Sequence, residues 1–155
     1  VTGVVYSPMR DELYCAEKGH GATCNGVPVR TSGRSFEDGI LCSALCLYRK
    51  EHAQVCSDII METYMNCNDI RRFGAAALEI CFLASGRCEL YFEYRLMPWD
   101  FAAAKLILTE AGGVLTGLDG KEPSLRKPGI VVAANSPANH ARMLEIVQRH
   151  INNQV

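Results

Sequence analysis

The sequence has no long hydrophobic run and almost no net charge. None of its apolar stretches reaches the about 18 residues that a membrane-spanning helix needs, and the pattern of a signal segment is missing at its start. With 16 basic and 17 acidic residues, the formal net charge is −1, and the basic residues are scattered. This balance gives no electrostatic reason to expect binding to nucleic acid or to an anionic membrane. We therefore expect a cytoplasmic protein with neither partner.

Motifs that mark several common enzyme classes and metal sites are also missing. There is no Gly-x-Ser-x-Gly elbow, no P-loop and no His-Glu-x-x-His motif. The eight cysteines include no Cys-x-x-Cys pair, and two His-x-x-x-Cys pairs lack a second pair at zinc-finger spacing. Cys42, Cys46 and Cys81 lie within apolar runs, where reduced cysteine packs as a small hydrophobic residue. This usage indicates reduced thiols rather than a disulfide framework.

The 155 residues, 48% of them hydrophobic and 21% charged, are enough for one domain with its own core. Hydrophobic periodicity and turn residues predict alternating strands and helices, which favours a layered α/β fold. We expect strands over residues 2–8, 11–19, 40–49, 69–73, 88–94 and 129–135, a hairpin at Asn25-Gly26, and a hairpin or loop over residues 113–124. We expect helices over residues 52–67 and 75–85, one that begins at Asp100 and ends at Gly112-Gly113, and one after Ser136 as N-cap with Pro137 at N1.

The stretch MPWDFAAAKLILTEAGG places a carboxylate, Asp100, at the start of a helix that is otherwise apolar. Asp100 stands just before Phe101 and the three alanines 102–104, so its position predicts an N-cap, where free backbone N–H groups and the helix dipole stabilise a negative charge. The alternative is that Asp100 turns outward and binds a metal ion. The small residues that follow leave the backbone open to close approach by a ligand or a neighbouring element.

Two further places along the chain could contribute to a binding site. Gly74, Ala75 and Ala76 follow a predicted strand, and such a helix start either packs closely on the strand or offers N–H donors to a phosphate or hydroxyl. Two helix starts that each follow a strand favour a shared cleft outside the strand ends. Glu93 alternates with Leu90 and Phe92 in the strand CELYFEY, so it shares a face with Tyr91. It is either an exposed salt-bridge partner or an acceptor for a polyol.

Several ordered segments together resemble the inositol monophosphatase family. WDFAAAKLILTEAGG resembles the C-terminal signature of that family, and IRRFGAAALEICFLASGRCELYFEY resembles its Arg, Gly-x-Ala-Ala and aromatic-plus-Glu run. GVVYSPMRDELYCAEKGHGATCNGVPV and GIVVAAN are similar to its hairpin segment and to its C-terminal end. The resemblance covers nearly all 155 residues. It implies a layered α/β sandwich of the inositol monophosphatase/fructose-bisphosphatase type, with a mixed sheet flanked by helices.

The resemblance also implies an activity, a cofactor and site residues. The protein is expected to be a Mg²⁺-dependent phosphomonoesterase that hydrolyses a small polyol phosphate, with inositol monophosphate first among the candidates. By position, Asp100 matches a metal-binding and catalytic aspartate, Glu93 an acceptor for substrate hydroxyls, and Gly74, Ala75 and Ala76 the helix start against the substrate. Ala75 departs from the family pattern, because a Thr or Ser often contributes a hydroxyl there. The family also leads us to expect a homodimer.

The Glu-Glu pair and the Asp-Pro-x-Asp-Gly-Thr loop of the family are absent from this sequence. Asp100 alone cannot complete the octahedral oxygen shell of Mg²⁺. We therefore expect residues 1–155 to form one domain that is the C-terminal half of a phosphatase fold, to lack the upstream half, and to be inactive alone. Alternative substrates within the class are sugar bisphosphates, nucleotide 3′-phosphates and histidinol phosphate. An alternative from another class is a non-catalytic half that binds a partner.

Overall fold

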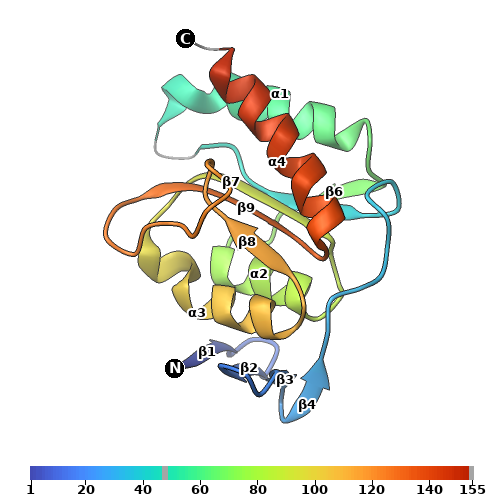
Figure 1. Cartoon of the computed structure of the whole chain (residues 1–155), viewed down its shortest axis with the longest axis vertical. Coiled ribbons are helices and arrows are strands. Elements are labelled where there is room, and N and C mark those ends of the chain that lie inside the picture. Colours follow the sequence, from blue (N-terminus) through green and yellow to red (C-terminus); the bar gives the residue numbers. More distant parts are fainter. Residues whose placement is uncertain (47–48, 154–155) are drawn as a thin grey trace.

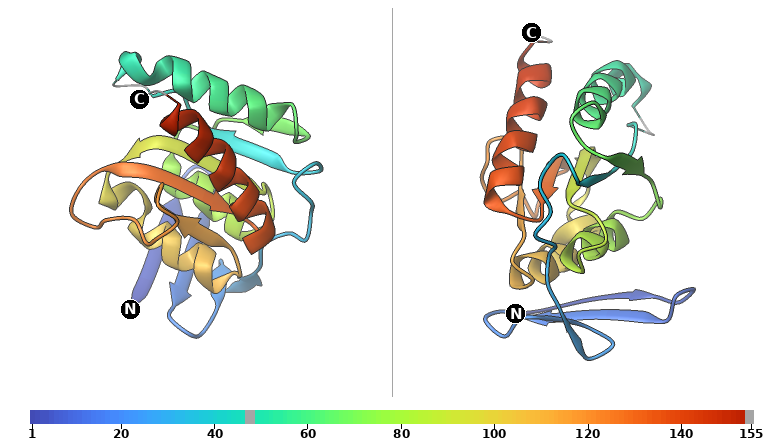
Figure 2. Two further views of the ribbon diagram at one scale, coloured as in Figure 1. Left: turned by 45° about the horizontal axis from the view of Figure 1, so that its top comes forward. Right: turned by 90° about the vertical axis from the view of Figure 1, so that its right-hand side faces the viewer.

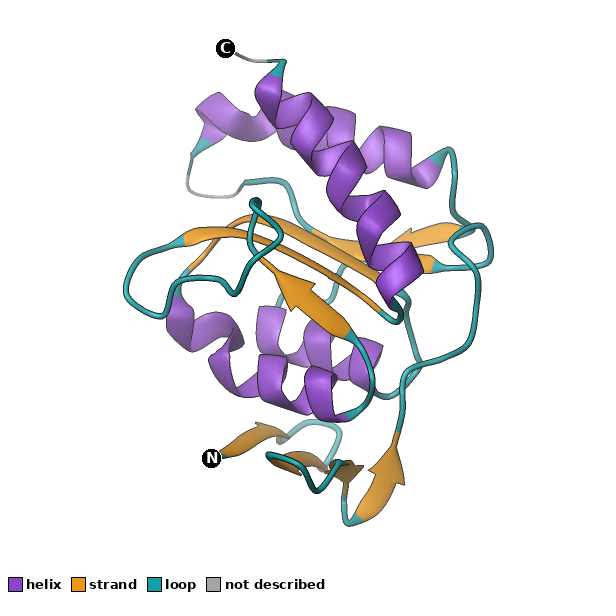
Figure 3. Ribbon diagram, viewed as in Figure 1, coloured by secondary structure: helices purple, strands orange, loops and turns teal. Residues whose placement is uncertain are grey.

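Two sheets and two pairs of helices alternate as layers along the long axis of the molecule (Figure 1). The computed structural model describes residues 1–46 and 49–153. A four-stranded sheet forms one end, a helix pair covers it, a five-stranded sheet follows, and a second helix pair forms the other end (Figure 2). The expected layered α/β arrangement is confirmed, and Figure 3 shows helices and strands segregated into these layers.

The four-stranded sheet is antiparallel and keeps the order of the sequence. Its strands are β1 (Thr2–Ser7), β2 (Glu12–Glu17), β3 (Ala22–Cys24) and β4 (Val27–Val29). Asn25 and Gly26 connect β3 to β4 with φ of 50° and 78°. Positive φ at both central residues is typical of the type I′ turn, whose twist matches that of the flanking strands. The predicted hairpin is therefore confirmed.

The five-stranded sheet is mixed. Its strands are β5 (Ile40–Ser43), β6 (Asp69–Arg71), β7 (Leu90–Leu96), β8 (Val114–Thr116) and β9 (Gly129–Ala134), in the order β6-β5-β7-β9-β8. β5 runs parallel to β6 and β7, whereas β9 runs antiparallel to β7 and β8. The strand predicted over residues 40–49 is too long, because β5 ends at Ser43, close to where its short partner β6 ends. Residues 47–48 of that prediction lie outside the described residues.

The helices are α1 (Ala53–Tyr64), α2 (Ala76–Ala84), α3 (Pro98–Glu110) and α4 (Pro137–Asn152), and a 3₁₀ turn, Lys50–His52, precedes α1. α2 and α3 lie between the two sheets, and α1 and α4 cover the other face of the five-stranded sheet (Figure 1). Ser136 caps α4 as predicted, because its Oγ accepts the Asn139 N–H at 3.2 Å. No helix in the described part of the chain is long and apolar enough to cross a membrane.

Glycines end the two helices between the sheets. After α2, Gly86 has φ of 73°, and the Gly86 and Arg87 N–H groups bond to the carbonyls of Leu83 and Phe82. After α3, Gly112 has φ of 96° and starts the same pattern. This is the Schellman arrangement, which needs a left-handed residue just past the helix and therefore favours glycine. Both predicted helix ends are confirmed.

Two hydrophobic clusters share strand β7. One cluster fills the space between the sheets around α2 and α3, and Tyr91 belongs to it. The other lies between the five-stranded sheet and the pair α1 and α4, and Leu90 and Phe92 belong to it. Since successive side chains of a strand point to opposite faces, β7 contributes to both clusters. This burial fixes the position of the strand that carries Glu93.

Candidate functional site

A small pocket at the carboxyl end of β7 contains every residue that the sequence predicted for the site. It has a volume of about 240 Å³ and is lined by Cys46, Gly74, Ala75, Ala76, Glu93, Arg95, Leu96 and Asp100. The starts of α2 and α3 and the end of β7 therefore meet, as expected for helices that follow strands. The volume is slightly below the about 300–1,000 Å³ of most ligand pockets, which suits a small ligand.

Asp100 is not the N-cap of α3. The helix begins at Pro98, Met97 is the N-cap, and Asp100 is the third helical residue. Proline fixes φ near a helical value and lacks an N–H group, so it is favoured at the first helical position. The N-cap therefore lies three residues earlier than predicted, at Met97. Asp100 Oδ2 accepts the Met97 N–H at 2.8 Å. Its carboxylate therefore stabilises the helix start while it also lines the pocket.

Glu93 faces the pocket beside Tyr91, as the strand alternation predicts. The Tyr91 hydroxyl, which is fully buried, donates to Glu93 Oε2 at 2.6 Å. Burial raises the pKa of the Glu93 carboxyl, and the negative charges of Glu79 and Asp100 raise it further, while the Tyr91 hydrogen bond and the charge of Arg72 act in the opposite direction. Glu93 is partly buried and takes part in none of the ion pairs among the described residues. It is therefore not an exposed salt-bridge partner.

The wall opposite Glu93 is formed by Gly74, Ala75 and Ala76. Gly74 has φ of 86°, a left-handed conformation that glycine adopts without the steric cost of a side chain. Ala75 is the N-cap of α2 and makes no side-chain capping bond. With one glycine and two alanines, the wall presents mainly backbone to the pocket, so a ligand can approach the helix start closely.

The sequence prediction missed four residues of the pocket region: Cys46, Arg95 and Leu96, which line it, and Glu79. Arg95 lines the pocket two residues after Glu93, beyond the strand expected over residues 88–94. The pairing of β7 with β9 shifts register between Glu93 and Leu96, and nothing in the sequence indicated this irregularity. Cys46 also lines the pocket, but its sequence context, an apolar run, points only to burial. Glu79 lies behind the wall with 2% of its surface exposed. A lone acidic residue four positions after a helix N-cap resembles a capping box and could have marked it.

The carboxylates of this pocket fit only part of a Mg²⁺ site. Asp100 and Glu93 offer the oxygen ligands that Mg²⁺ prefers, but that ion takes a near-octahedral shell. Within residues 1–46 and 49–153, no three His, Cys, Asp or Glu side chains are grouped so that they could hold a metal ion. The residues present therefore do not complete a metal centre by themselves.

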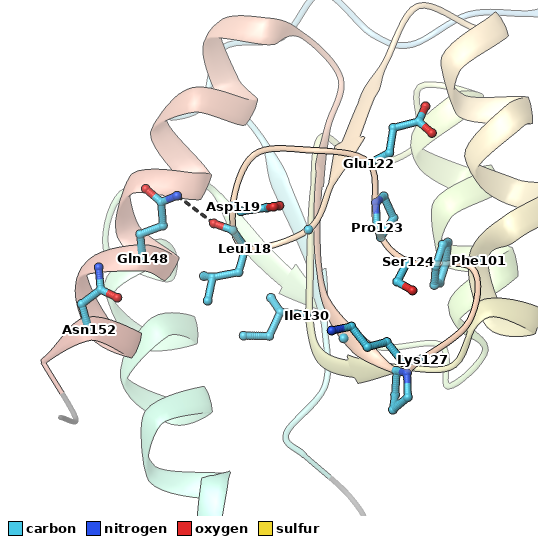
Figure 4. A pocket seen from close by; sticks show the side chains of 13 residues that line it. Phe101, Leu118, Asp119, Glu122, Pro123, Ser124, Lys127, Ile130, Gln148 and Asn152 are labelled. Atoms are coloured by element: carbon cyan, nitrogen blue, oxygen red, sulfur yellow. Dashed lines mark hydrogen bonds between the residues drawn. The ribbon is translucent and has the colours of Figure 1, made fainter.

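A larger hollow of about 660 Å³ lies elsewhere, between the loop after β8 and the end of α4 (Figure 4). Gln148 of α4 donates to the Leu118 carbonyl at 2.7 Å and ties this loop to the helix. The charged side chains that line the hollow, Asp119, Glu122 and Lys127, are exposed and of both signs. None of the predicted site residues lies there, so the smaller pocket is the better candidate site.

Known proteins with similar sequences and structures share this fold. The Nus factor SuhB of Vibrio cholerae is 34% identical over 152 residues, which cover 97% of this chain and 56% of that protein. The crystal structure of the extragenic suppressor protein suhB from Bartonella henselae superposes with a TM-score of 0.87 at 31% identity, over 96% of this chain and 57% of that one.

A staphylococcal protein, SaIMPase-II, has been solved with inositol monophosphate bound. It matches with a TM-score of 0.85 at 28% identity, over 99% of this chain and 59% of that one. A further structure of SaIMPase-II contains 2′AMP. The chain thus spans little more than half the length of these relatives.

The family assignment rests on nearly the whole chain. Residues 1–152 match the inositol monophosphatase family. Solved structures of family members superpose on the chain, which confirms the fold class expected from the sequence resemblance. The chain therefore belongs to the inositol monophosphatase family.

Proposed function

We propose that the protein is a Mg²⁺-dependent phosphomonoesterase and that its preferred substrate is a small polyol phosphate, with inositol monophosphate as the first candidate. The observation that carries this proposal is the pocket in which Glu93, Asp100 and the start of α2 meet. Family membership supports phosphatase chemistry. The inositol monophosphate bound to SaIMPase-II supports the substrate class.

Each pocket residue has a part in this proposal. Asp100 would hold a Mg²⁺ ion, which when bound supplies positive charge to the phosphate and activates a water molecule. Glu93 accepts a hydrogen bond from a hydroxyl of the substrate, and its own orientation is held by Tyr91. The alcohol part of the substrate lies against Gly74, Ala75 and Ala76. Among the described residues that line the pocket, Arg95 carries the only positive charge and attracts the phosphate dianion.

The proposal needs metal ligands beyond the described residues. Asp100 and Glu93 alone offer too few oxygen atoms for the shell of Mg²⁺. The chain spans 56% of the Vibrio cholerae relative. We infer that the remaining ligands come from outside these 155 residues, that the chain alone is inactive, and that the active protein is a cytoplasmic homodimer.

The other substrates within the class remain candidates for the same pocket. Sugar bisphosphates, nucleotide 3′-phosphates and histidinol phosphate all combine a phosphate monoester with further polar groups. The 2′AMP bound to SaIMPase-II favours testing a nucleotide among them. Arg95 would favour substrates with a second acidic group, since it adds a positive charge at the pocket.

A second candidate function is that the chain acts by binding a partner, without catalysis. The Vibrio cholerae and Escherichia coli relatives, 34% and 39% identical, are named Nus factors and not phosphatases. The incomplete metal centre points in the same direction. This candidate predicts that loss of the Asp100 carboxylate leaves the biological function unchanged.

The experiment that tests the first candidate is phosphate release from inositol 1-phosphate, a sugar bisphosphate, adenosine 3′,5′-bisphosphate and histidinol phosphate, with and without Mg²⁺. It uses both the 155-residue chain and the complete protein that contains it. Asp100→Asn should lower turnover by orders of magnitude with little loss of stability, because Asn retains an oxygen acceptor for the Met97 N–H.

Asp119→Asn is the matched control. Asp119 is exposed on the loop beside the larger hollow, so the same chemical change there should leave turnover as it is. Turnover near the wild-type value in Asp100→Asn would rule out the role of Asp100. No Mg²⁺-dependent release from any substrate by the complete protein would favour the partner-binding function.

A further inference from the structure

Glu79 is a buried acidic residue that, among the described residues, forms no ion pair, and its carboxylate binds backbone N–H groups outside its own helix. Only 2% of its surface is exposed, and its Oε1 atom accepts the backbone N–H groups of Phe73 at 2.5 Å and Gly74 at 2.9 Å. In a capping box, an acidic side chain one position earlier binds the N–H of the N-cap residue. Glu79 instead reaches past the N-cap, Ala75, to the two residues that lead into α2.

Two kinds of contact hold the segment that leads into α2. The Phe73 ring packs edge-on against the buried Phe82 ring and lies beside Arg10, and Glu79 binds the backbone. Phe73 and Gly74 lie outside any helix or strand, and Phe73 is 50% exposed. Glycine has the greatest backbone freedom of any residue type, and a Cβ at Gly74 would meet no atom of the described residues within 4 Å. Ala75 is exposed, and Ala76 contributes only a methyl group to the cluster between the sheets. The two hydrogen bonds to Glu79 are the contacts that act directly on the backbone of Phe73 and Gly74, so they restrict the conformation of the wall.

The same segment forms one side of the pocket that contains Glu93 and Asp100. Catalysis and binding depend on distances held to a fraction of an ångström, so a mobile wall would weaken the fit to a substrate. Glu93 and Asp100 are placed by a buried strand and by a helix start, whereas Gly74 is placed by a side chain behind it.

We propose that Glu79 is a positioning residue, which fixes the wall formed by Gly74, Ala75 and Ala76 through the Phe73 and Gly74 N–H groups. It acts on binding of the alcohol part of the substrate and contacts no reacting atom. This role rests on the proposed function of the pocket.

The test compares Glu79→Ala with Glu79→Gln in the complete protein. Alanine removes the acceptor and retains the helix, whereas glutamine retains an oxygen that can accept both N–H groups. For Glu79→Ala, amide hydrogen exchange at Phe73 and Gly74 should be about tenfold faster. The KM for inositol 1-phosphate should rise about tenfold with a smaller change in kcat. In Glu79→Gln, the amide exchange rates and the KM should both lie close to the wild-type values.

Glu89→Gln is the control for a merely structural effect. Glu89 is fully buried and also accepts a backbone N–H, that of Ile40 at 2.8 Å, but at the other end of β7. The Glu89→Gln variant should have a lower melting temperature, but its KM and its amide exchange at Phe73 and Gly74 should equal those of the wild type. In the wild-type protein, these two amides should exchange slowly although they lie outside regular structure. If Glu79→Ala does not fold, the exchange rates of these two amides in the wild type test whether Glu79 holds the wall.

Exchange of Phe73 and Gly74 at wild-type rates in Glu79→Ala, or fast exchange in the wild type, would overturn the inference. Faster exchange in Glu79→Ala with an unchanged KM would show that the wall does not bind substrate, which also overturns it. Absence of phosphatase activity in the wild-type protein would instead contradict the proposed function, and the exchange rates would still show whether Glu79 holds the wall.

Discussion

The hydroxyl of Tyr91 donates to the carboxylate of Glu93 at 2.6 Å, and the two side chains lie on the same face of β7. Tyr91 is fully buried, so the donor cannot turn away to water. Burial raises the pKa of the Tyr91 hydroxyl well above its ordinary value, and the nearby charge of Glu93 adds to this. Tyr91 therefore remains a neutral donor and holds Glu93 in one orientation.

Glu93→Gln should make the folded protein more stable at neutral pH. The pKa of Glu93 is raised in the folded state, so its stabilising contribution is complete below the unfolded value of 4.5 and is lost as the pH rises through the folded value. Glutamine carries no charge and can still accept from Tyr91. Thermal unfolding from pH 4 to pH 8 should show that the melting temperature of Glu93→Gln rises relative to that of the wild type as the pH increases. If the melting temperatures of the two proteins depended on pH in the same way, the raised pKa of Glu93 would be contradicted.

Tyr91→Phe should move the ionisation of Glu93 to higher pH. The Tyr91 hydrogen bond lowers the pKa of Glu93, so its loss adds to the upward shift caused by burial. The acidic limb of the pH profile for kcat/KM should move to higher pH, so that kcat/KM falls about tenfold at the acidic end. Tyr94→Phe is the control, since Tyr94 lies in the same strand and its hydroxyl makes no hydrogen bond to Glu93. An unchanged profile for Tyr91→Phe would show that Glu93 does not depend on this donor.

Gly74→Ala should destabilise the protein by about 1–2 kcal/mol, because a side chain in the left-handed region meets its own backbone. The position is otherwise open, since a Cβ at Gly74 meets nothing within 4 Å. Gly129→Ala is the matched control: its surroundings are equally open, and its φ is not positive. Chemical denaturation of both variants measures the difference. Equal stabilities would mean that the left-handed conformation costs nothing here.

The isolated chain should associate with itself through the outer face of the four-stranded sheet. Val4 and Tyr6 are each 52% exposed there, and Leu13, the partner of Tyr6 in the sheet, is 40% exposed. β1 is also an edge strand with a single neighbour, which favours pairing between copies. Light scattering should show oligomers that Val4→Lys reduces. Leu125→Lys, at a loop residue that is 65% exposed, should not reduce them. A monodisperse monomer at high concentration would contradict this prediction.

Local patterns were enough to predict most of the fold. Ser136-Pro137, Asn25-Gly26 and the glycines after α2 and α3 each specify a backbone conformation through their own chemistry, and each is found where expected. The start of α3 was placed too late, because a conspicuous Asp100 was given more weight than Pro98. The end of β5 was placed too late, because an apolar run does not tell how long the neighbouring strand is.

The candidate site could be predicted in part. Local patterns singled out Asp100, Glu93 and Gly74, since each stands at an element boundary or alternates with buried neighbours, but their expected roles came from the family resemblance. All three line the pocket. Glu79 was missed, because an acidic residue within LEICFLA looks like a surface position until the loop that it binds is folded over it. Arg95 was missed, because it follows the predicted strand and lies where the register of β7 against β9 shifts.

The two sides of the pocket differ in how closely they are packed into the rest of the protein. Glu93 pairs with Val131 in the sheet, and its strand is packed between both hydrophobic clusters. Ala75 lies outside both clusters and is exposed. Substitutions at Ala75 can therefore accumulate at little cost in folding, whereas any movement of Glu93 disturbs the whole domain. During evolution, substitutions that change substrate preference are accordingly expected first at the start of α2, around Ala75, while Glu93 and its strand stay unchanged.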